Sequence, residues 1–220
     1  MTYPQIKRRQ SGFTLIEIAI VLVIIGLLLG GILKGQELIT QGRIRNVAND
    51  FQSMTAAINL YQDRYRAIPG DDIGAATRWA VTGTSTTSGN GDGVIGIASS
   101  STFPAFNSGT TGDESRLFWH HLRLAGLVGG PTTTGALGTA NPINAVSGVT
   151  GVQNIAFGIP GLVICSNNLP AKIAQAIDTQ FDDGNATTGT VRGGAAMSAT
   201  APIVDYVDDG TTFYIVCKAP

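Results

Sequence analysis

A single carboxylate, Glu17, stands near the beginning of an otherwise uncharged run that extends from Phe13 to Leu33. An ionisable group at that depth in a membrane-length segment costs roughly 2.5 kcal/mol or more unless a partner or water relieves it. An ammonium group can neutralise a buried carboxylate, and removing either partner leaves an expensive unpaired charge. We therefore expect Glu17 to pair with a cation. The alternative is a carboxylate that faces lipid headgroups near the end of the helix.

The segment SGNGDGVI partly copies an EF-hand calcium loop. Asn90 and Asp92 hold its third and fifth positions, but Ser88 and Ser99 hold the first and twelfth, where acidic ligands should be. We expect a glycine-rich turn and no cofactor here. Calcium binding through Asn90 and Asp92 is the alternative, and it would need carboxylates from elsewhere in the chain.

The adjacent pair His120-His121 suggests a metal ligand or a general base at first sight. Neighbouring residues on a helix point about 100° apart, so the two rings cannot easily serve one site, and no HExxH pattern surrounds them. We expect one ring to pack and the other to be solvated. The sequence also has no G-x-S-x-G motif and no Walker loop, and it predicts a protein that is not an enzyme.

The run that contains Glu17 must be positioned by a membrane helix. The stretch from Phe13 to Leu33 is long enough to cross a hydrocarbon core of about 30 Å at ~1.5 Å per residue. The cluster KRR precedes it and Lys34 is the one cation just after it, so we expect a cytoplasmic N-terminus and an extracytoplasmic remainder. A secretory signal peptide is the alternative, but such segments are shorter and end at an A-x-A type site.

Charge is otherwise sparse and nearly balanced. The chain has 220 residues, of which 13% are charged, with 14 basic and 15 acidic side chains. Three of the basic ones belong to the KRR cluster, so the rest of the chain is mildly acidic. Nucleic-acid binding is not indicated by this distribution.

The N-terminal residues carry a family resemblance. A basic leader that ends in Gly12, followed by FTLIEIAIVLVIIGLLLGG, resembles the prepilin N-terminus of type IV pilins and type II secretion pseudopilins over Lys7 to about Gln36. The resemblance implies that prepilin peptidase cuts between Gly12 and Phe13 and methylates the new amine of Phe13. It also places Glu17 where the family carries its assembly carboxylate, which meets the N-terminal amine of a neighbouring subunit.

The resemblance implies a structural subunit that is held in the bacterial inner membrane by a single span. Such a subunit interacts with an inner-membrane assembly platform and joins identical or related pilins in a periplasmic or extracellular filament, either a type IV pilus or a secretion pseudopilus. The alternative is a minor pilin at a filament tip. Such a protein would bind DNA, a surface or another protein through its Ser/Thr/Gly-rich loops.

A second apolar pattern continues beyond the membrane run, with spacings that alternate between three and four. Its members are Ile44, Val47, Phe51, Met54, Ile58, Tyr61 and Tyr65. This is one stripe of an amphipathic helix, so we expect a helix from Phe13 to about Ala67 that stops at Pro69-Gly70. We expect the stripe to cover the inner face of a sheet. Coiled-coil dimerisation is the alternative, but the flanking positions lack consistent charge pairing.

The predicted fold class is α+β, with a long N-terminal helix whose first half spans the membrane and whose second half packs against a small antiparallel-sheet head, as in the pilin lollipop. The expected boundaries are a cleaved leader at 1–12, a transmembrane helix at 13–33, its extracytoplasmic continuation at 34–68 and a globular head at 69–220. Cys165 and Cys217 are the only cysteines, and both fall in the exported head. An even pair in an oxidising compartment predicts a disulfide.

Within the head, the patterns predict three helices and three strands. DIGAATRWA reads as a short helix capped by Asp71, and TGDESRLFWHHLRLAGL as a helix with a Thr111–Glu114 capping box, ended by Gly126. AKIAQAIDTQFDD is expected to form a helix that begins at Pro170. GLVICSNNL is a predicted strand, and IVDYV with TTFYIVCK is a predicted closing hairpin.

Overall fold

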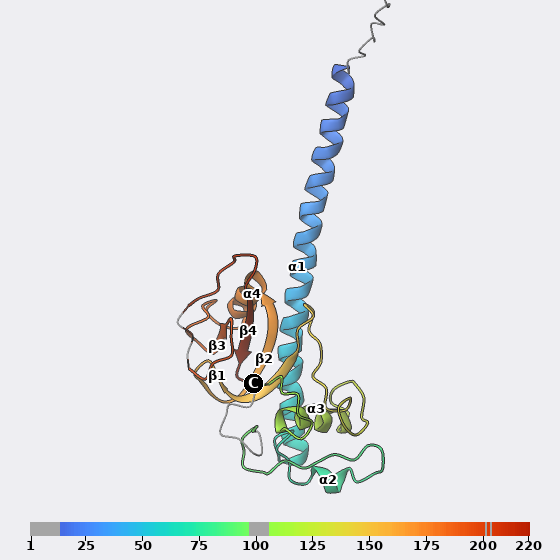
Figure 1. Cartoon of the computed structure of the whole chain (residues 1–220), viewed down its shortest axis with the longest axis vertical. Coiled ribbons are helices and arrows are strands. Elements are labelled where there is room, and N and C mark those ends of the chain that lie inside the picture. The colour runs from blue at the N-terminus through green and yellow to red at the C-terminus, as the bar shows by residue number, and fades with distance from the viewer. Residues whose placement is uncertain (1–13, 97–105, 201, 203) are drawn as a thin grey trace, which may run out of the picture. The chain divides into compact units, whose positions relative to one another are not determined.

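The computed structural model describes residues 14–96, 106–200, 202 and 204–220. The elements in chain order are α1 (Leu15–Tyr65), α2 (Ala75–Arg78), α3 (Glu114–Leu124), β1 (Thr150–Ala156), β2 (Ile159–Pro170), α4 (Ala171–Phe181), β3 (Val191–Gly194) and β4 (Phe213–Lys218) (Figure 1). The chain divides into two compact units, Met1–Gln41 and Gly42–Pro220. A long N-terminal helix and a small antiparallel-sheet head are both present, which confirms the predicted α+β class.

The four strands form one antiparallel sheet in the order β1-β2-β4-β3. β4, the last strand in the chain, therefore lies inside the sheet, between β2 and β3 (Figure 1). The predicted hairpin of IVDYV with TTFYIVCK is wrong, because residues 204–207 form no strand and β4 pairs with β2 and β3 instead. Tyr214 of β4 still holds the preceding segment, since its hydroxyl accepts a hydrogen bond from the Val207 amide at 2.8 Å.

Two strands have no counterpart in the sequence-based prediction. β3 has the sequence VRGG, whose paired glycines are depleted in strands, and β1 has the sequence TGVQNIA, which is buried at its first four residues and so shows no alternation. A Cβ on Gly193 would crowd the hydroxyl of Tyr206, so glycine permits the close approach of that ring to β3. Partners distant in sequence thus decide the strand formation here.

The predicted stripe on α1 is confirmed as core. Its six members from Ile44 to Tyr61 are all buried, and Tyr65 is half-buried. They join one hydrophobic cluster with inward residues of every strand, which include Val152, Ile164, Val191 and Val216, and with residues of α3 and α4. Because this stripe is buried in the core of the head, it is not available for a coiled-coil interface, and the coiled-coil alternative is wrong.

Several helix ends differ from the predicted ones. α1 ends at Tyr65, before Pro69-Gly70, because Arg66 adopts a left-handed conformation with φ of 57°. The Asp71 cap is wrong, since α2 is a single turn whose N-cap is Gly74. The Thr111–Glu114 capping box is also wrong, since α3 begins at Glu114 itself.

The remaining predicted ends agree with the structure. Gly126, with φ of 72°, follows the end of α3 as expected. Pro170 immediately precedes α4, and it also closes β2, which contains the predicted strand GLVICSNNL.

Candidate functional site

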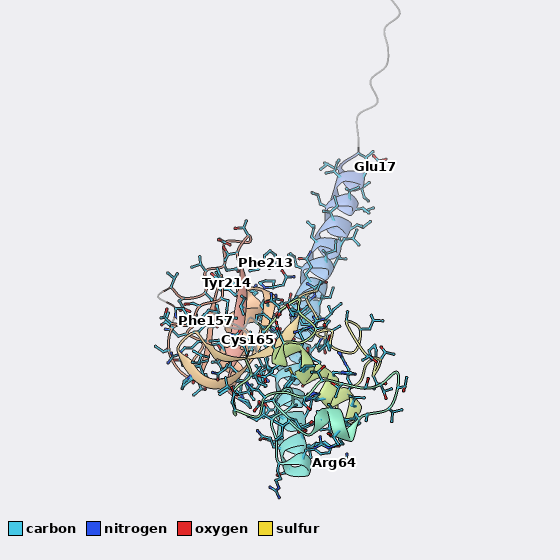
Figure 2. All side chains as sticks on the ribbon, turned by 60° about the horizontal axis from the view of Figure 1, so that its bottom comes forward. Glu17, Arg64, Phe157, Cys165, Phe213 and Tyr214 are labelled. Carbon is cyan, nitrogen blue, oxygen red and sulfur yellow. A yellow bond between two sulfur atoms is a disulfide. The ribbon has the colours of Figure 1, made fainter. Side chains whose placement is uncertain are left out.

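Glu17 lies in the first turn of α1 (Figure 2). Its Oε2 accepts hydrogen bonds from the Thr14 amide at 2.8 Å and from the Thr14 hydroxyl at 2.7 Å, and the Thr14 hydroxyl accepts one from the Glu17 amide at 3.3 Å. This reciprocal pattern is a capping box, with Thr14 at the N-cap and Glu17 three residues later. In the single chain, therefore, the carboxylate is partnered by its own helix terminus.

This capping role could have been predicted from the sequence, because Thr14-x-x-Glu17 has the capping-box spacing. The predicted cleavage residue Gly12 and the predicted methylation residue Phe13 lie outside the described residues. The structure therefore places one of the three predicted processing and assembly residues, Glu17, at the very start of the helix.

The helix that follows Glu17 is apolar on all sides and uncovered. Its best 18-residue window has a mean hydropathy of 2.9, and by length and composition it is the one described helix that could cross a membrane. Leu15 is 92% exposed and Leu27 is 73% exposed. A helix that is apolar all round is typical of a membrane span or of the core of a large protein.

In the head, three carboxylates converge on the loop at residues 89–96. Asp71, Asp92 and Glu114 each place an oxygen within 4.8 Å of the other two, close enough to hold a metal ion together. Asp71 and Glu114 are buried, and Asp92 is exposed. The side-chain amide of Asn90 donates to Asp92 at 2.9 Å.

Backbone amides of the loop already occupy the two buried carboxylates. Asp71 accepts hydrogen bonds from the amides of Gly91 at 2.6 Å, Asp92 at 3.2 Å and Gly93 at 2.8 Å. Glu114 accepts from Asn90 at 3.0 Å and Gly96 at 2.8 Å. Burial raises the pKa of Glu114, and the neighbouring carboxylates add to the rise against the effect of those amides.

This geometry accounts for the glycine-rich turn without a metal. A Cβ on Gly89 would collide with the backbone of Asp71, so the loop needs glycine where it crosses that residue. Calcium binding through Asn90 and Asp92 stays the alternative to the predicted metal-free turn. Asp71 and Glu114 would be the distant carboxylates that such a site requires, and the ion would compete with the amides that they now bind.

The histidine pair is buried on both members, with 1% of His120 and none of His121 exposed. Nδ1 of His121 accepts a hydrogen bond from the Gly70 amide at 2.9 Å, so Nε2 carries the proton and donates to the Thr87 carbonyl at 2.9 Å. Burial lowers the pKa of His121 to about 4. Nε2 of His120 meets the Thr132 carbonyl at 3.1 Å instead. The predicted solvated histidine is therefore wrong, because a loop carbonyl covers each ring.

A buried network ties the end of α1 to α2. Asp72 accepts hydrogen bonds from the Tyr61 hydroxyl at 2.7 Å and the Gly74 amide at 2.8 Å, and it pairs with Arg78 at 2.6 Å. Burial alone would raise the pKa of Asp72, but these donors together lower it. Both oxygens of the Asp72 carboxylate are thus bonded within the head, and we assign this network a structural role.

A second acidic group, Asp178, Asp182 and Asp183, also comes close enough for a metal ion. Here too the loop and its neighbours supply the donors. Asp178 accepts from the Tyr206 hydroxyl at 2.8 Å and the Gly184 amide at 3.0 Å, and the amides of residues 190 and 191 donate to Asp182. These carboxylates hold the turn between α4 and β3.

The predicted disulfide between Cys165 and Cys217 is present. The two residues are register partners on β2 and β4, and both are fully buried. Their side chains lie on the opposite sheet face from Ile164 and Val216, in a second cluster with Phe157. The bond therefore joins the interior strand β4 to its neighbour on the sheet face away from α1.

Residues 7–33 match the family model described as Prokaryotic N-terminal methylation motif, which is the prepilin signature of type IV pilins and pseudopilins. The resemblance stated from the sequence is confirmed over this segment. The roles predicted for Gly12, Phe13 and Glu17 within it stay predictions. No curated protein and no solved structure is significantly similar to the chain.

Proposed function

We propose that this chain is a structural subunit of a type IV pilus-like or type II secretion pseudopilus filament and that prepilin peptidase processes it. The observation that carries the proposal is the methylation motif at residues 7–33, which is the substrate signature of that peptidase. Cleavage between Gly12 and Phe13 removes the basic leader and leaves the apolar helix attached to the head. The mature protein therefore keeps its anchor.

The exposed apolar helix supports membrane insertion before assembly. Residues 15–33 are all exposed in the described part of the chain, and the cluster KRR precedes them in the sequence. The positive-inside bias keeps the leader in the cytoplasm, where the peptidase acts on it, and places the head outside. In a filament, the same apolar surfaces pack against neighbouring subunits in place of lipid.

Glu17 supplies the registry between subunits in this proposal. One polar pair in an otherwise apolar interface fixes the offset of the helices, because any other offset leaves the charge unpaired. The methylated amine of Phe13 in a neighbouring copy is the cation that Glu17 meets. When the subunit is alone, the hydrogen bonds from Thr14 partly compensate the carboxylate, and they make the monomer a tolerable state in the membrane.

The substitution Glu17→Gln tests this assignment, because it removes the charge and keeps the capping box. Glutamine at that position can still accept from Thr14, so the first turn of α1 should persist. Breaking a buried ion pair costs about 3 kcal/mol or more, which corresponds to a loss of roughly a hundredfold in subunit incorporation. We expect processed, membrane-bound monomer and almost no sheared filament relative to total mature subunit.

Two controls separate the charge from other effects. Thr14→Val removes the cap and keeps the carboxylate, and it should assemble with little loss. Asp63→Asn removes an exposed α1 carboxylate, and it should also assemble normally. Normal assembly of Glu17→Gln would refute the pairing. A protein found once per filament, at its end, would be a tip-binding pilin and not the structural subunit proposed.

A further inference from the structure

A pocket of about 290 Å³ opens beside the second half of α1. Asp50 and Met54 of α1 line one side, Trp119 of α3 and the following Leu127 and Val128 line another, and Ile143 precedes β1 at the rim. Ile143 is 76% exposed although it is apolar. The walls are therefore mostly hydrocarbon.

Asp50 is the one acidic residue that lines this pocket. It is half-buried, and within residues 14–96, 106–200, 202 and 204–220 it has no hydrogen-bond or ion-pair partner. Burial raises the pKa of its carboxyl group. A desolvated carboxylate above hydrocarbon walls suits a long basic side chain, whose methylene stem packs on the walls while its charged head reaches the acid.

A second copy of this chain can bring such a side chain to the pocket, given the filament proposed above, on which this inference rests. When Glu17 of one copy meets the Phe13 amine of another, the second copy is shifted by four helix residues, or ~6 Å at ~1.5 Å per residue. In a helical filament, every part of a subunit is displaced by the same distance along the axis. For a helix that runs along the filament axis, Arg45 of the second copy is then level with Asn49 and within ~1.5 Å, along the axis, of Asp50.

The face of the helix selects Arg45 over its neighbour Arg43. In a heterologous filament contact, the two copies use different faces. At 3.6 residues per turn, Arg45 points about 140° away from Asp50, whereas Arg43 points only about 20° away and so shares its face. Arg45 is exposed, and within the described part of the chain it forms no ion pair.

We propose that the pocket at Asp50 receives Arg45 from α1 of the neighbouring copy, forming a second intersubunit ion pair in the extracytoplasmic part of the filament. This pair acts in the same step as Glu17, since the copy that accepts the amine also accepts the arginine. This ion pair fixes the axial offset of neighbouring subunits at their heads, in addition to the offset that Glu17 fixes at the start of α1.

Cysteine cross-linking in the full-length protein tests the pair. In the variant Asp50→Cys/Arg45→Cys, the two cysteines of one helix lie about 9 Å apart, beyond disulfide reach, so any bond joins two copies. The native cysteines are paired and fully buried. In cells that carry the assembly machinery, we expect an oxidant to convert filaments of this variant to cross-linked multimers. The matched control Asp50→Cys/Arg43→Cys should remain uncross-linked.

Charge exchange tests the same contact without cysteines. Asp50→Arg and Arg45→Asp should each lower sheared-filament yield about tenfold, corresponding to a loss near 1.4 kcal/mol, and the double exchange should restore it. The inference is overturned if filaments form and depend on Glu17 while the cysteines do not cross-link and the double exchange gives no rescue. If Asp50→Arg alone blocks assembly without rescue, another basic group occupies the pocket, and Arg45 is wrong. If the unmodified protein forms no filament at all, so that substituting Glu17 changes nothing, the proposed function itself is contradicted.

Discussion

The hydrogen bonds of Asp71 predict a large stability effect for one conservative substitution. Asp71→Asn keeps the shape of the side chain but replaces one accepting oxygen by an NH2 group. On either orientation, that NH2 group faces an amide donor that the carboxylate now accepts, from Gly91 and Asp92 on one side or Gly93 on the other. The substitution therefore removes at least one short bond and sets two donors against each other in a buried place.

The size of the effect can be worked from those bonds. A hydrogen bond to a charged group contributes about 1.5–3 kcal/mol, and an unsatisfied buried donor costs about 1–3 kcal/mol. Removing the negative charge also relieves Glu114, whose pKa the Asp71 carboxylate helps to raise, so part of the loss is offset. We expect a net loss of about 3 kcal/mol in the free energy of unfolding.

The matched control is Asp92→Asn at the tip of the same loop. Asp92 is exposed, and its carboxylate bonds only the Val94 amide and the Asn90 side chain in the described part of the chain. We expect a loss of no more than about 1 kcal/mol for this variant. Comparable losses for Asp71→Asn and Asp92→Asn would contradict the assignment of Asp71 as the residue that organises the loop.

Denaturant unfolding of the full-length protein in detergent micelles measures both variants, with the fluorescence of Trp79 and Trp119 as the signal. The titrations are run once with excess EDTA and once with millimolar calcium. We expect the Asp71→Asn loss to be the same in both conditions, because backbone amides satisfy the carboxylate. The reasoning is refuted if the unmodified protein is stabilised by several kcal/mol in calcium and Asp71→Asn abolishes that gain, because the trio would then be a metal site.

Two further outcomes concern the head. The folded state holds His121 in its neutral form, because its pKa of about 4 lies below the value of 6.5 in an unfolded chain. Between those two pH values, the unfolded state therefore binds more protons than the folded state. Stability should thus fall on acidification through that window, by up to about 3 kcal/mol. The raised pKa of Glu114 changes stability in the opposite direction over acidic pH. The contribution of His121 is therefore measured as the difference in the free energy of unfolding between the unmodified protein and His121→Gln at each pH. Equal pH dependence of that free energy in the two proteins would contradict the contribution of His121. Cys165→Ser opens a bridge with a sequence separation of 52 and should lower the free energy of unfolding by roughly 4 kcal/mol on the chain-entropy model. Exported protein that reacts with an alkylating reagent before reduction would contradict the disulfide.

Periodic features of the sequence predicted the structure well. The stripe from Ile44 to Tyr61 follows the helical repeat over five turns, so no knowledge of its partners was needed to identify it as core. Pro170 and Gly126 mark helix boundaries through their own backbone preferences. In each of these cases the determining interaction is local in the chain.

The errors arose where distant residues decide the outcome. The sequence spacing of Asp71 and Glu114 suggests local helix caps. Their carboxylate oxygens instead accept hydrogen bonds from backbone amides of a loop about 20 residues away, which sequence spacing cannot reveal. β3 is a strand because Cys217 and its neighbours in β4 pair with it, although its own sequence VRGG disfavours that state. The burial of His120 likewise depends on a carbonyl that a later loop supplies.

The N-terminus of the mature chain tests the central claim most directly. Intact-mass measurement of protein taken from membranes and from sheared filaments should give a chain that begins at methylated Phe13. Gly12→Ala should shift the membrane fraction to the uncleaved mass while the protein still inserts, because the small residue serves the peptidase and not the span. A mature chain that begins after Gly31, or an uncleaved chain in the unmodified protein, would contradict processing by prepilin peptidase and with it the proposed filament subunit.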